Sequence, residues 1–92
     1  MKNIWKIINA TEPTNLPENV FFDFVSTRLK KFRVERGYTN YEHLAYDIGI
    51  SRSQYGRCEK GANMKLSTLL KILNFLDLSI DEFFEGINEH KL

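Results

Sequence analysis

The hydrophobic residues between positions 18 and 36 recur at the spacing of one helix face. They lie three or four positions apart, with polar residues between them, and are Phe21, Phe24 or Val25, Leu29 and Phe32. Pro17 precedes this stretch and suits the first turn of a helix, where a missing amide N–H costs nothing. Gly37 can end the helix. The pattern therefore predicts a helix from about Glu18 to Arg36.

Two shorter helices are predicted next, with a tight turn between them. Asn40 can cap a helix from Tyr41 to Ile48, because its side chain accepts a hydrogen bond from an amide that the helix leaves unpaired. Gly49 can end that helix in a left-handed conformation, which glycine adopts at little cost. Ser51 can then cap a further helix from about Arg52 to Lys60. The inner side of the pair is apolar and consists of Leu44, Ala45, Ile48, Ile50, Tyr55 and Cys58. Such an arrangement is typical of a helix-turn-helix.

Two more helices are predicted after Gly61, which can end the preceding one. Ser67 can cap the first of them, whose apolar residues are too many for one face: Leu66, Leu69, Leu70, Ile72, Leu73, Phe75 and Leu76. Ser79 and Glu82 have the S-x-x-E spacing of a capping box, which opens a last helix through about Gly86. Since no segment has the pattern of a core strand, we predict an all-α protein with five helices.

The ends of the chain differ from this helical part. We predict an N-terminal arm and linker over residues 1–17, the domain over 18–87 and a short tail over 88–92. The arm carries Trp5 among three isoleucines, Ile4, Ile7 and Ile8, in a pattern that fits either a short amphipathic helix or a strand. Such a cluster would be an unusual exposed surface on a monomer. We expect the arm to cover its own domain's core, to exchange between subunits, or to become ordered with a partner.

Charge separates the regions further. The formal net charge is +1, yet residues 26–65 carry nine basic and four acidic side chains, a net charge of +5. Residues 1–25 and 66–92 carry net charges of −1 and −3. Positive charge is therefore concentrated on the helix-turn-helix half, as expected of a surface that faces phosphates.

Several functional classes are disfavoured by the sequence. No apolar run approaches the roughly 18 to 20 residues that cross a bilayer, so no membrane partner is expected. The single cysteine, Cys58, lies on an inner helix face, and a buried free thiol suits a cytosolic protein. His43 and His90 are isolated from other ligand-type residues, which argues against a metal site. Cys58 has no histidine partner, which argues against a nucleophile. We expect no enzyme activity and no cofactor.

The stretch from Arg28 to Phe84 resembles the DNA-binding domain of the phage repressor/Cro-type (Xre-like) helix-turn-helix family. The matching residues are Arg33, Gly37, LAYDIGIS at 44–51, Tyr55, Cys58, Glu59, Gly61 and LSTLLKILNFLDLSIDEF at 66–83. The loop from Gly37 to Asn40 is one residue longer than is usual in that family. The resemblance implies a lambda-repressor-like fold, double-stranded DNA as the partner, and the cytoplasm of a bacterium or a phage-infected cell.

By this resemblance, the helix after Ser51 lies in the major groove. The residues expected to contact bases are Arg52, Ser53, Gln54 and Arg57. Arginine can bond to two acceptors of guanine at once, and glutamine can pair similarly with adenine. The residues expected to contact phosphates are Asn40, Tyr41, Ser51, Lys60, Asn63 and Lys65. Gly56, on the same helix, is expected to leave room for close approach of DNA or backbone, or simply to be tolerated.

Arg33 and Glu59 match a charge pair that ties the first helix to the end of the third in this family. We expect this pair to be structural, so that its loss affects folding rather than specificity.

The predicted function is sequence-specific DNA binding by a transcriptional repressor that acts as a homodimer on a palindromic operator. The dimer surface is expected among the excess apolar residues of the last two helices, or in the arm. One alternative is an antitoxin that represses its own operon and binds a toxin through the Trp5 arm or the C-terminal tail. Another is a protein-interaction module that keeps the fold and uses its third helix to bind a protein.

Overall fold

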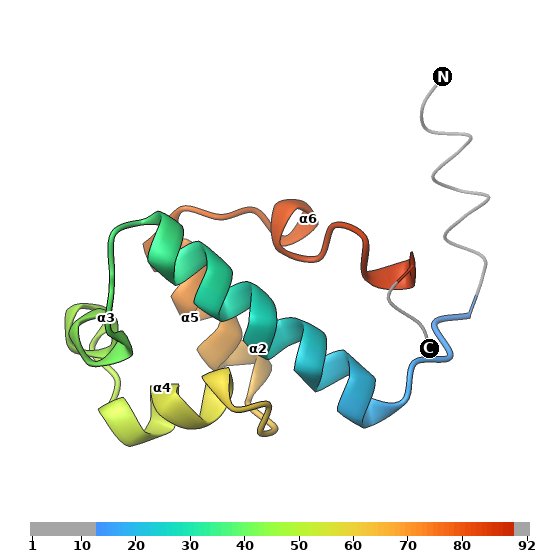
Figure 1. Cartoon of the computed structure of the whole chain (residues 1–92), viewed down its shortest axis with the longest axis horizontal. Helices are drawn as coiled ribbons and strands as arrows, with labels where there is room; N and C mark the ends of the chain where they lie inside the picture. Colours follow the sequence, from blue (N-terminus) through green and yellow to red (C-terminus); the bar gives the residue numbers. More distant parts are fainter. Residues whose placement is uncertain (1–12, 90–92) are drawn as a thin grey trace.

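The computed structural model describes residues 13–89, which form five α-helices and no strand in that range (Figure 1). The helices are α2 (Glu18–Glu35), α3 (Tyr41–Ile48), α4 (Arg52–Glu59), α5 (Leu66–Leu76) and α6 (Ile80–Phe83), and a 3₁₀ turn, η1, covers Ile87–Glu89. The all-α, five-helix prediction is therefore confirmed. Residues 1–12 of the predicted arm and linker, and the last three residues of the predicted tail, lie outside the described residues.

The turn between α3 and α4 is set by local hydrogen bonds. The Asn40 side chain accepts a bond of 2.9 Å from the amide of His43, and Ser51 Oγ accepts one of 3.0 Å from the amide of Gln54. Gly49 ends α3 with a φ of +93°, a value that side chains rarely allow. All three predicted roles are confirmed. The two caps and the glycine together fix where α4 begins and in which direction it leaves the turn.

The predicted start of α5 and the predicted end of α6 are wrong. α5 begins at Leu66 rather than at a cap on Ser67, because the amides of Thr68 and Leu69 already bond to the carbonyl of Lys65. Ser67 therefore lies inside the first helical turn. α6 ends at Phe83 instead of near Gly86. Ser79 Oγ does accept a bond of 2.9 Å from the amide of Glu82, which is one half of the expected capping box.

Arg28 explains why α6 can be so short. Its guanidinium donates to the carbonyl of Phe83 at 3.0 Å and also to the carbonyl of Glu85. These are carbonyls that a longer helix would have paired within itself. The same guanidinium lies 4.5 Å from the centre of the Phe24 ring. Arg28 thus fixes the end of α6 against the middle of α2.

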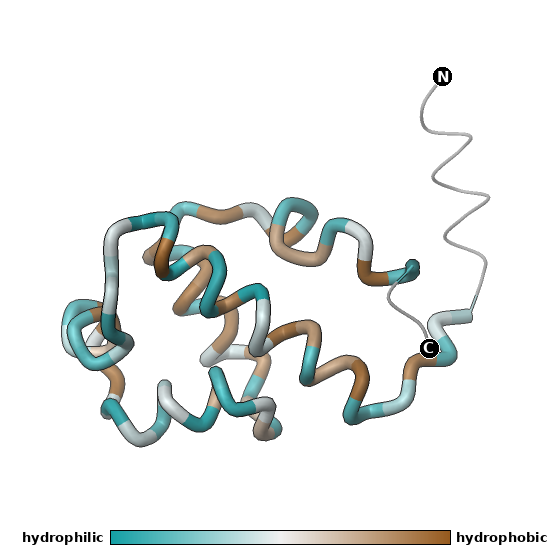
Figure 2. The backbone as a smooth tube through the Cα atoms, viewed as in Figure 1, coloured by the Kyte–Doolittle hydropathy of each residue, from teal (hydrophilic) through white to brown (hydrophobic). Residues whose placement is uncertain are grey.

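The core lies between α2 and the other helices. Its fully buried members include Leu29 from α2, Leu44 from α3, Tyr55 from α4 and Ile72 from α5. In Figure 2, the residues of α5 are mainly hydrophobic and those of α4 mainly hydrophilic. This difference accounts for the larger share of α5 in the core. All five helices contribute to this core, since Phe83 of α6 is also fully buried in it, while Arg52, Ser53 and Arg57 of α4 stay exposed.

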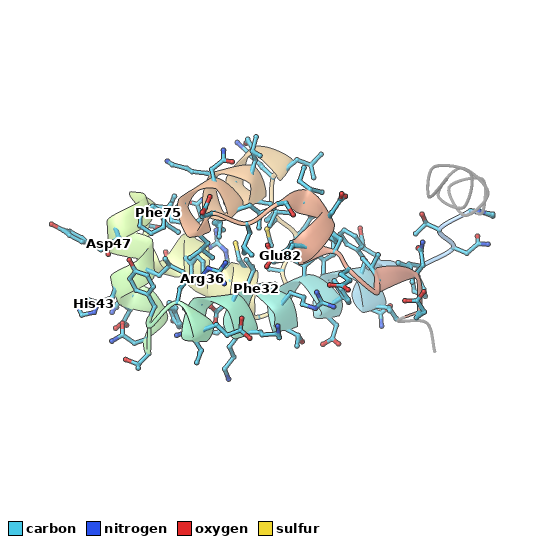
Figure 3. The ribbon with its side chains drawn as sticks, turned by 90° about the horizontal axis from the view of Figure 1, so that it is seen from above. Phe32, Arg36, His43, Asp47, Phe75 and Glu82 are labelled. Carbon is cyan, nitrogen blue, oxygen red and sulfur yellow. The ribbon has the colours of Figure 1, made fainter. Side chains whose placement is uncertain are left out.

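A second arginine joins the far end of α2 to α5. Arg36 Nε donates to the carbonyl of Leu76 at 3.0 Å, and the guanidinium lies 5.4 Å from the centre of the Phe32 ring. Figure 3 shows Arg36 and Phe32 together in the middle of the molecule. Because Leu76 is the last residue of α5, the bond satisfies a carbonyl that the helix leaves free.

Arg33 and Glu59 form a buried ion pair between α2 and the end of α4. Arg33 Nε lies 2.7 Å from Glu59 Oε2 and Nη2 lies 3.2 Å from Oε1, so the pair is bidentate. The side chains are only 5% and 8% exposed. Arg33 Nη1 also donates to the carbonyl of Tyr38 at 2.6 Å, which fixes the loop before α3. The hydrogen bonding of Arg33 to the Glu59 carboxylate is the main reason that the pKa of Arg33 is raised.

Tyr55 lies beside this pair, and its hydroxyl predicts a specific pH dependence. The side chain is fully buried, and no hydrogen bond of good geometry reaches the hydroxyl from the described residues. Burial, and then the nearby Glu59 carboxylate, raises the pKa of Tyr55 above its ordinary value of 10.0. The folded state therefore keeps a proton that the unfolded state loses above pH 10. The stability that this proton contributes is complete below pH 10 and is lost as the pH rises further.

Tyr55→Phe should flatten that alkaline loss. One such group steepens the decline by up to about 1.4 kcal/mol per pH unit. Urea denaturation of the wild type and the variant between pH 7 and 11 would measure the two slopes. Tyr46→Phe, at a tyrosine that is 83% exposed, is the matched control and should keep the wild-type slope. Equal slopes for Tyr55→Phe and the wild type would contradict the assignment.

Candidate nucleic-acid interface

The outer face of α4 is polar and exposed. Tyr55 and Cys58 point inward and are buried, as predicted. The four predicted base-contacting residues lie on the other side: Arg52, Ser53 and Arg57 are exposed and Gln54 is half-buried. Helix geometry explains this division of α4 into a buried and an exposed side. Positions 55 and 58 are three residues apart, so their side chains lie on the same side of the helix.

Arg57 lies between two polar hollows. The first, of about 320 Å³, is lined by Tyr41, Glu42, Arg52, Ser53, Gly56, Arg57 and Lys60. The second, of about 170 Å³, is lined by Gln54, Arg57, Cys58, Asn63, Met64, Lys65 and Thr68. These two hollows, which share Arg57, therefore contain all four predicted base-contacting residues and four of the six predicted phosphate-contacting residues.

The remaining two predicted phosphate contacts lie at helix starts. Ser51 lines a third hollow of about 430 Å³ together with Gln54, Lys65, Ser67 and Lys71 among others. Asn40 is not among the residues lining these hollows, and it caps α3 one residue before Tyr41. Lys71 was not singled out from the sequence, because its position in an apolar helix gave no sign that it would lie near Ser51.

Gly56 was expected to leave room for DNA or backbone, or simply to be tolerated, and the structure shows what lies beside it. It is buried, and a Cβ atom placed there would lie 2.9 Å from the hydroxyl oxygen of Tyr41 and 3.1 Å from two of its ring carbons. The space beside Gly56 is thus occupied by the Tyr41 ring of α3. That ring also lies 6.0 Å from the ring of Tyr55. Gly56 is therefore the position at which α3 packs closely on α4.

Gly56→Ala should reveal this contact through its dependence on Tyr41. Alanine favours a helix by about 1 kcal/mol over glycine, yet here its methyl group must displace the Tyr41 ring. We expect Gly56→Ala to leave the free energy of unfolding nearly unchanged, and to raise it by about 1 kcal/mol when Tyr41→Ala is also present. Urea denaturation of the four proteins of this cycle measures the coupling. The same change in both backgrounds would mean that the ring does not occupy this space.

Arg52 is paired with an acidic residue that the sequence analysis did not select. Its Nη1 lies 3.2 Å from Glu42 Oε2, and the side chains are 75% and 53% exposed. An ion pair this exposed contributes little to stability. It does bias the direction of a guanidinium at the start of α4. Little in the sequence indicated this ion pair, because an acidic residue in the first turn of a helix is common.

Other polar groups near the motif already have partners. Tyr38 donates from its hydroxyl to Asp47 at 2.7 Å, and this bond is the main cause of the raised pKa of Tyr38. Figure 3 shows Asp47 and His43 at the α3 end of the molecule. Cys58 is buried and its thiol donates to the carbonyl of Gln54 at 3.4 Å, while burial raises its pKa. A buried protonated thiol is a poor nucleophile.

Within residues 13–89, no three histidine, cysteine or acidic side chains are grouped so that they could hold a metal ion. In the same range, no helix has the length and apolar character needed to cross a membrane.

Comparison with known families decides the assignment. The helix-turn-helix family HTH_3 matches the chain over residues 29–83, which is more than half of its 92 residues. The chain belongs to the HTH_3 family. This family, of the Cro/C1 or Xre-like type, consists of DNA-binding domains of transcriptional regulators, so the predicted resemblance is confirmed. No curated protein and no solved structure matches the chain significantly.

The match and the geometry cover the same part of the chain. It begins at Leu29 in α2 and ends at Phe83, the last residue of α6. The capped pair α3–α4 lies at its centre. The HTH_3 fold therefore positions one exposed helix, α4, together with the basic residues that flank it.

Proposed function

We propose that this HTH_3 protein is a transcriptional repressor that binds a two-fold symmetric operator as a homodimer, with α4 in the major groove. The observation that carries the proposal is the shared hollow in which Arg52, Ser53 and Arg57 lie beside Lys60. Two bidentate hydrogen-bond donors and a small hydroxyl suit base edges, and a lysine at the rim suits a phosphate. The proposed place of action is the cytoplasm of a bacterial or phage-infected cell.

Base contacts are assigned to the residues at the exposed start and middle of α4. The ion pair with Glu42 orients the Arg52 guanidinium, and Arg57 lines both hollows. Ser53 lines the first hollow together with both arginines, and Gln54 lines the second together with Lys65. Arginine at two positions favours guanine at two positions of the half-site.

Phosphate contacts are assigned to the residues around α4. Lys60 and Lys65 supply charge at its two sides, and Asn63 lies in the hollow with Lys65. Asn40 accepts a capping bond through its side-chain oxygen, so its amide group remains available as a donor. The Ser51 hydroxyl accepts the other capping bond and also shares a hydrogen bond of 3.4 Å with the Ser53 hydroxyl. Tyr41 lies on the floor of the first hollow with its hydroxyl beside Gly56.

Dimerisation follows from the size of the reading surface. α4 has eight residues and is about 12 Å long, so one copy contacts only a few base pairs. Two copies on a symmetric site double the readout, with half-site centres about one turn of DNA apart. This spacing makes the proposal testable without knowing the operator.

The test is the selection of bound sequences from a random duplex library at moderate salt, with Arg52→Ala/Arg57→Ala as the control protein. Both replaced side chains are exposed, so the control should stay folded. We expect a palindromic sequence with half-sites one turn apart for the wild type and no enrichment for the control. A selected site without two-fold symmetry would reject the dimer. No enrichment by folded wild-type protein would reject specific DNA binding and favour a protein-interaction module.

A further inference from the structure

Glu42 is an acidic side chain on a surface that is otherwise basic. It lies in the first turn of α3 and lines the first hollow together with Arg52, Arg57 and Lys60. Among the residues that the structure describes, no acidic side chain lines either of the other two hollows beside α4. A carboxylate at this place weakens the attraction of the surface for phosphates, because like charges repel. Affinity for DNA therefore does not explain why an acid lies here.

We propose that Glu42 is a positioning residue that determines specificity, because it keeps the Arg52 guanidinium for base edges and denies it to phosphates. The assignment rests on the proposed function, since it concerns how one arginine of the DNA-reading face is used. Glu42 thereby weakens binding to DNA of any sequence and strengthens the preference for one base pair of the operator.

The hydrogen bonds of Arg52 leave its bidentate edge free. Arg52 donates to Glu42 through Nη1, and its Nε and Nη2 atoms make no hydrogen bond within the described residues. Arg33 shows that one guanidinium can divide its donors in this way. Its Nε and Nη2 atoms bond to both oxygens of Glu59, while Nη1 donates to the carbonyl of Tyr38. Arg52 can therefore stay paired with Glu42 and still bond to the O6 and N7 acceptors of one guanine.

The charge of the pair favours a base over a phosphate. A phosphate is attracted by the net positive charge of a side chain, whereas guanine offers neutral acceptors that are bound by directed hydrogen bonds. Arg52 and Glu42 together are neutral, so the pair attracts a phosphate less than a free arginine does. Both side chains are exposed, and in water such a pair biases an arginine by up to about fivefold. The bias grows when DNA excludes water from the pair, because Coulomb interactions strengthen in a lower dielectric.

The test compares the wild type with Glu42→Gln, which keeps the size of the side chain and removes its charge. The affinity of each is measured for the selected operator, for operators changed at one base pair, and for a duplex of random sequence, at several salt concentrations. We expect Glu42→Gln to bind the random duplex severalfold more tightly, with a salt slope steeper by up to about 1. Its preference at the base pair that Arg52 reads should fall severalfold.

Two further comparisons separate positioning from other effects of the charge. In the Arg52→Ala background, Glu42→Gln should leave the base preference unchanged, because the side chain that Glu42 positions is missing. Asp81→Asn is the matched control for the loss of one negative charge. Asp81 is exposed in the first turn of α6 and lines none of the three hollows, so this variant should keep the wild-type preference at every base pair.

Each other outcome overturns the assignment. An unchanged preference in Glu42→Gln, with a wild type that reads the operator, would reject it and leave the proposed function intact. An equal change of preference in the Arg52→Ala background would make Glu42 itself a base contact, through a cytosine amino group. Weaker binding of Glu42→Gln to every duplex would show that Glu42 supports α3 instead. A wild type without sequence preference would reject the proposed function and this assignment together.

Discussion

Arg33→Met should lower the free energy of unfolding by about 3 to 5 kcal/mol, because it leaves the Glu59 carboxylate buried without its partner. Glu59 is 8% exposed and receives two bonds from Arg33. The same substitution removes the bond to the Tyr38 carbonyl that fixes the loop before α3. A small domain has a total stability of about 5 to 15 kcal/mol, so this loss is a large share of it.

Urea denaturation at pH 7 measures this loss, and the chain contains a control for it. Lys31 and Glu35 on α2 form an ion pair of 3.2 Å whose side chains are 53% and 49% exposed. Lys31→Met should cost less than about 1 kcal/mol, because water already screens that pair. Replacing both buried partners, in Arg33→Met/Glu59→Leu, should recover much of the stability. Equal losses for Arg33→Met and Lys31→Met would show that burial does not set the effect.

Arg57→Ala should have the largest effect on DNA recognition. Arg57 is exposed and lies between the two hollows that contain the other proposed base contacts. Loss of one bidentate base contact costs about 1 to 3 kcal/mol of discrimination, or roughly 5- to 150-fold. The variant should therefore bind the selected operator more weakly and accept other bases at one position of each half-site.

Lys65→Ala is the comparison, because a phosphate contact carries no base information. It should weaken binding to all duplexes alike and lower the slope of log affinity against log salt by about 1. Titration of both variants with the operator and single-base variants of it, at several salt concentrations, separates the two roles. Uniform weakening by Arg57→Ala would reject its assignment to a base.

The elements that were predicted correctly depend on interactions within a few residues. Asn40 and Ser51 cap helices through amides three positions away, and Gly49 needs only its own missing side chain. Ser67 shows the limit of predictions from local sequence alone. Serine is a good cap, yet Lys65 takes the position because the Lys65 carbonyl already accepts the first helical bonds of α5.

The sequence by itself determined five helices, the turn of the helix-turn-helix and which side of α4 faces outward. Helical periodicity and local caps are sufficient for these features. The tertiary structure alone decided that Tyr41 fills the space above Gly56, that Glu42 directs Arg52, and that Arg28 ends α6. These partners lie 10 to 57 positions apart along the chain. A glycine or an exposed acid has many roles open to it, and packing between helices selects one.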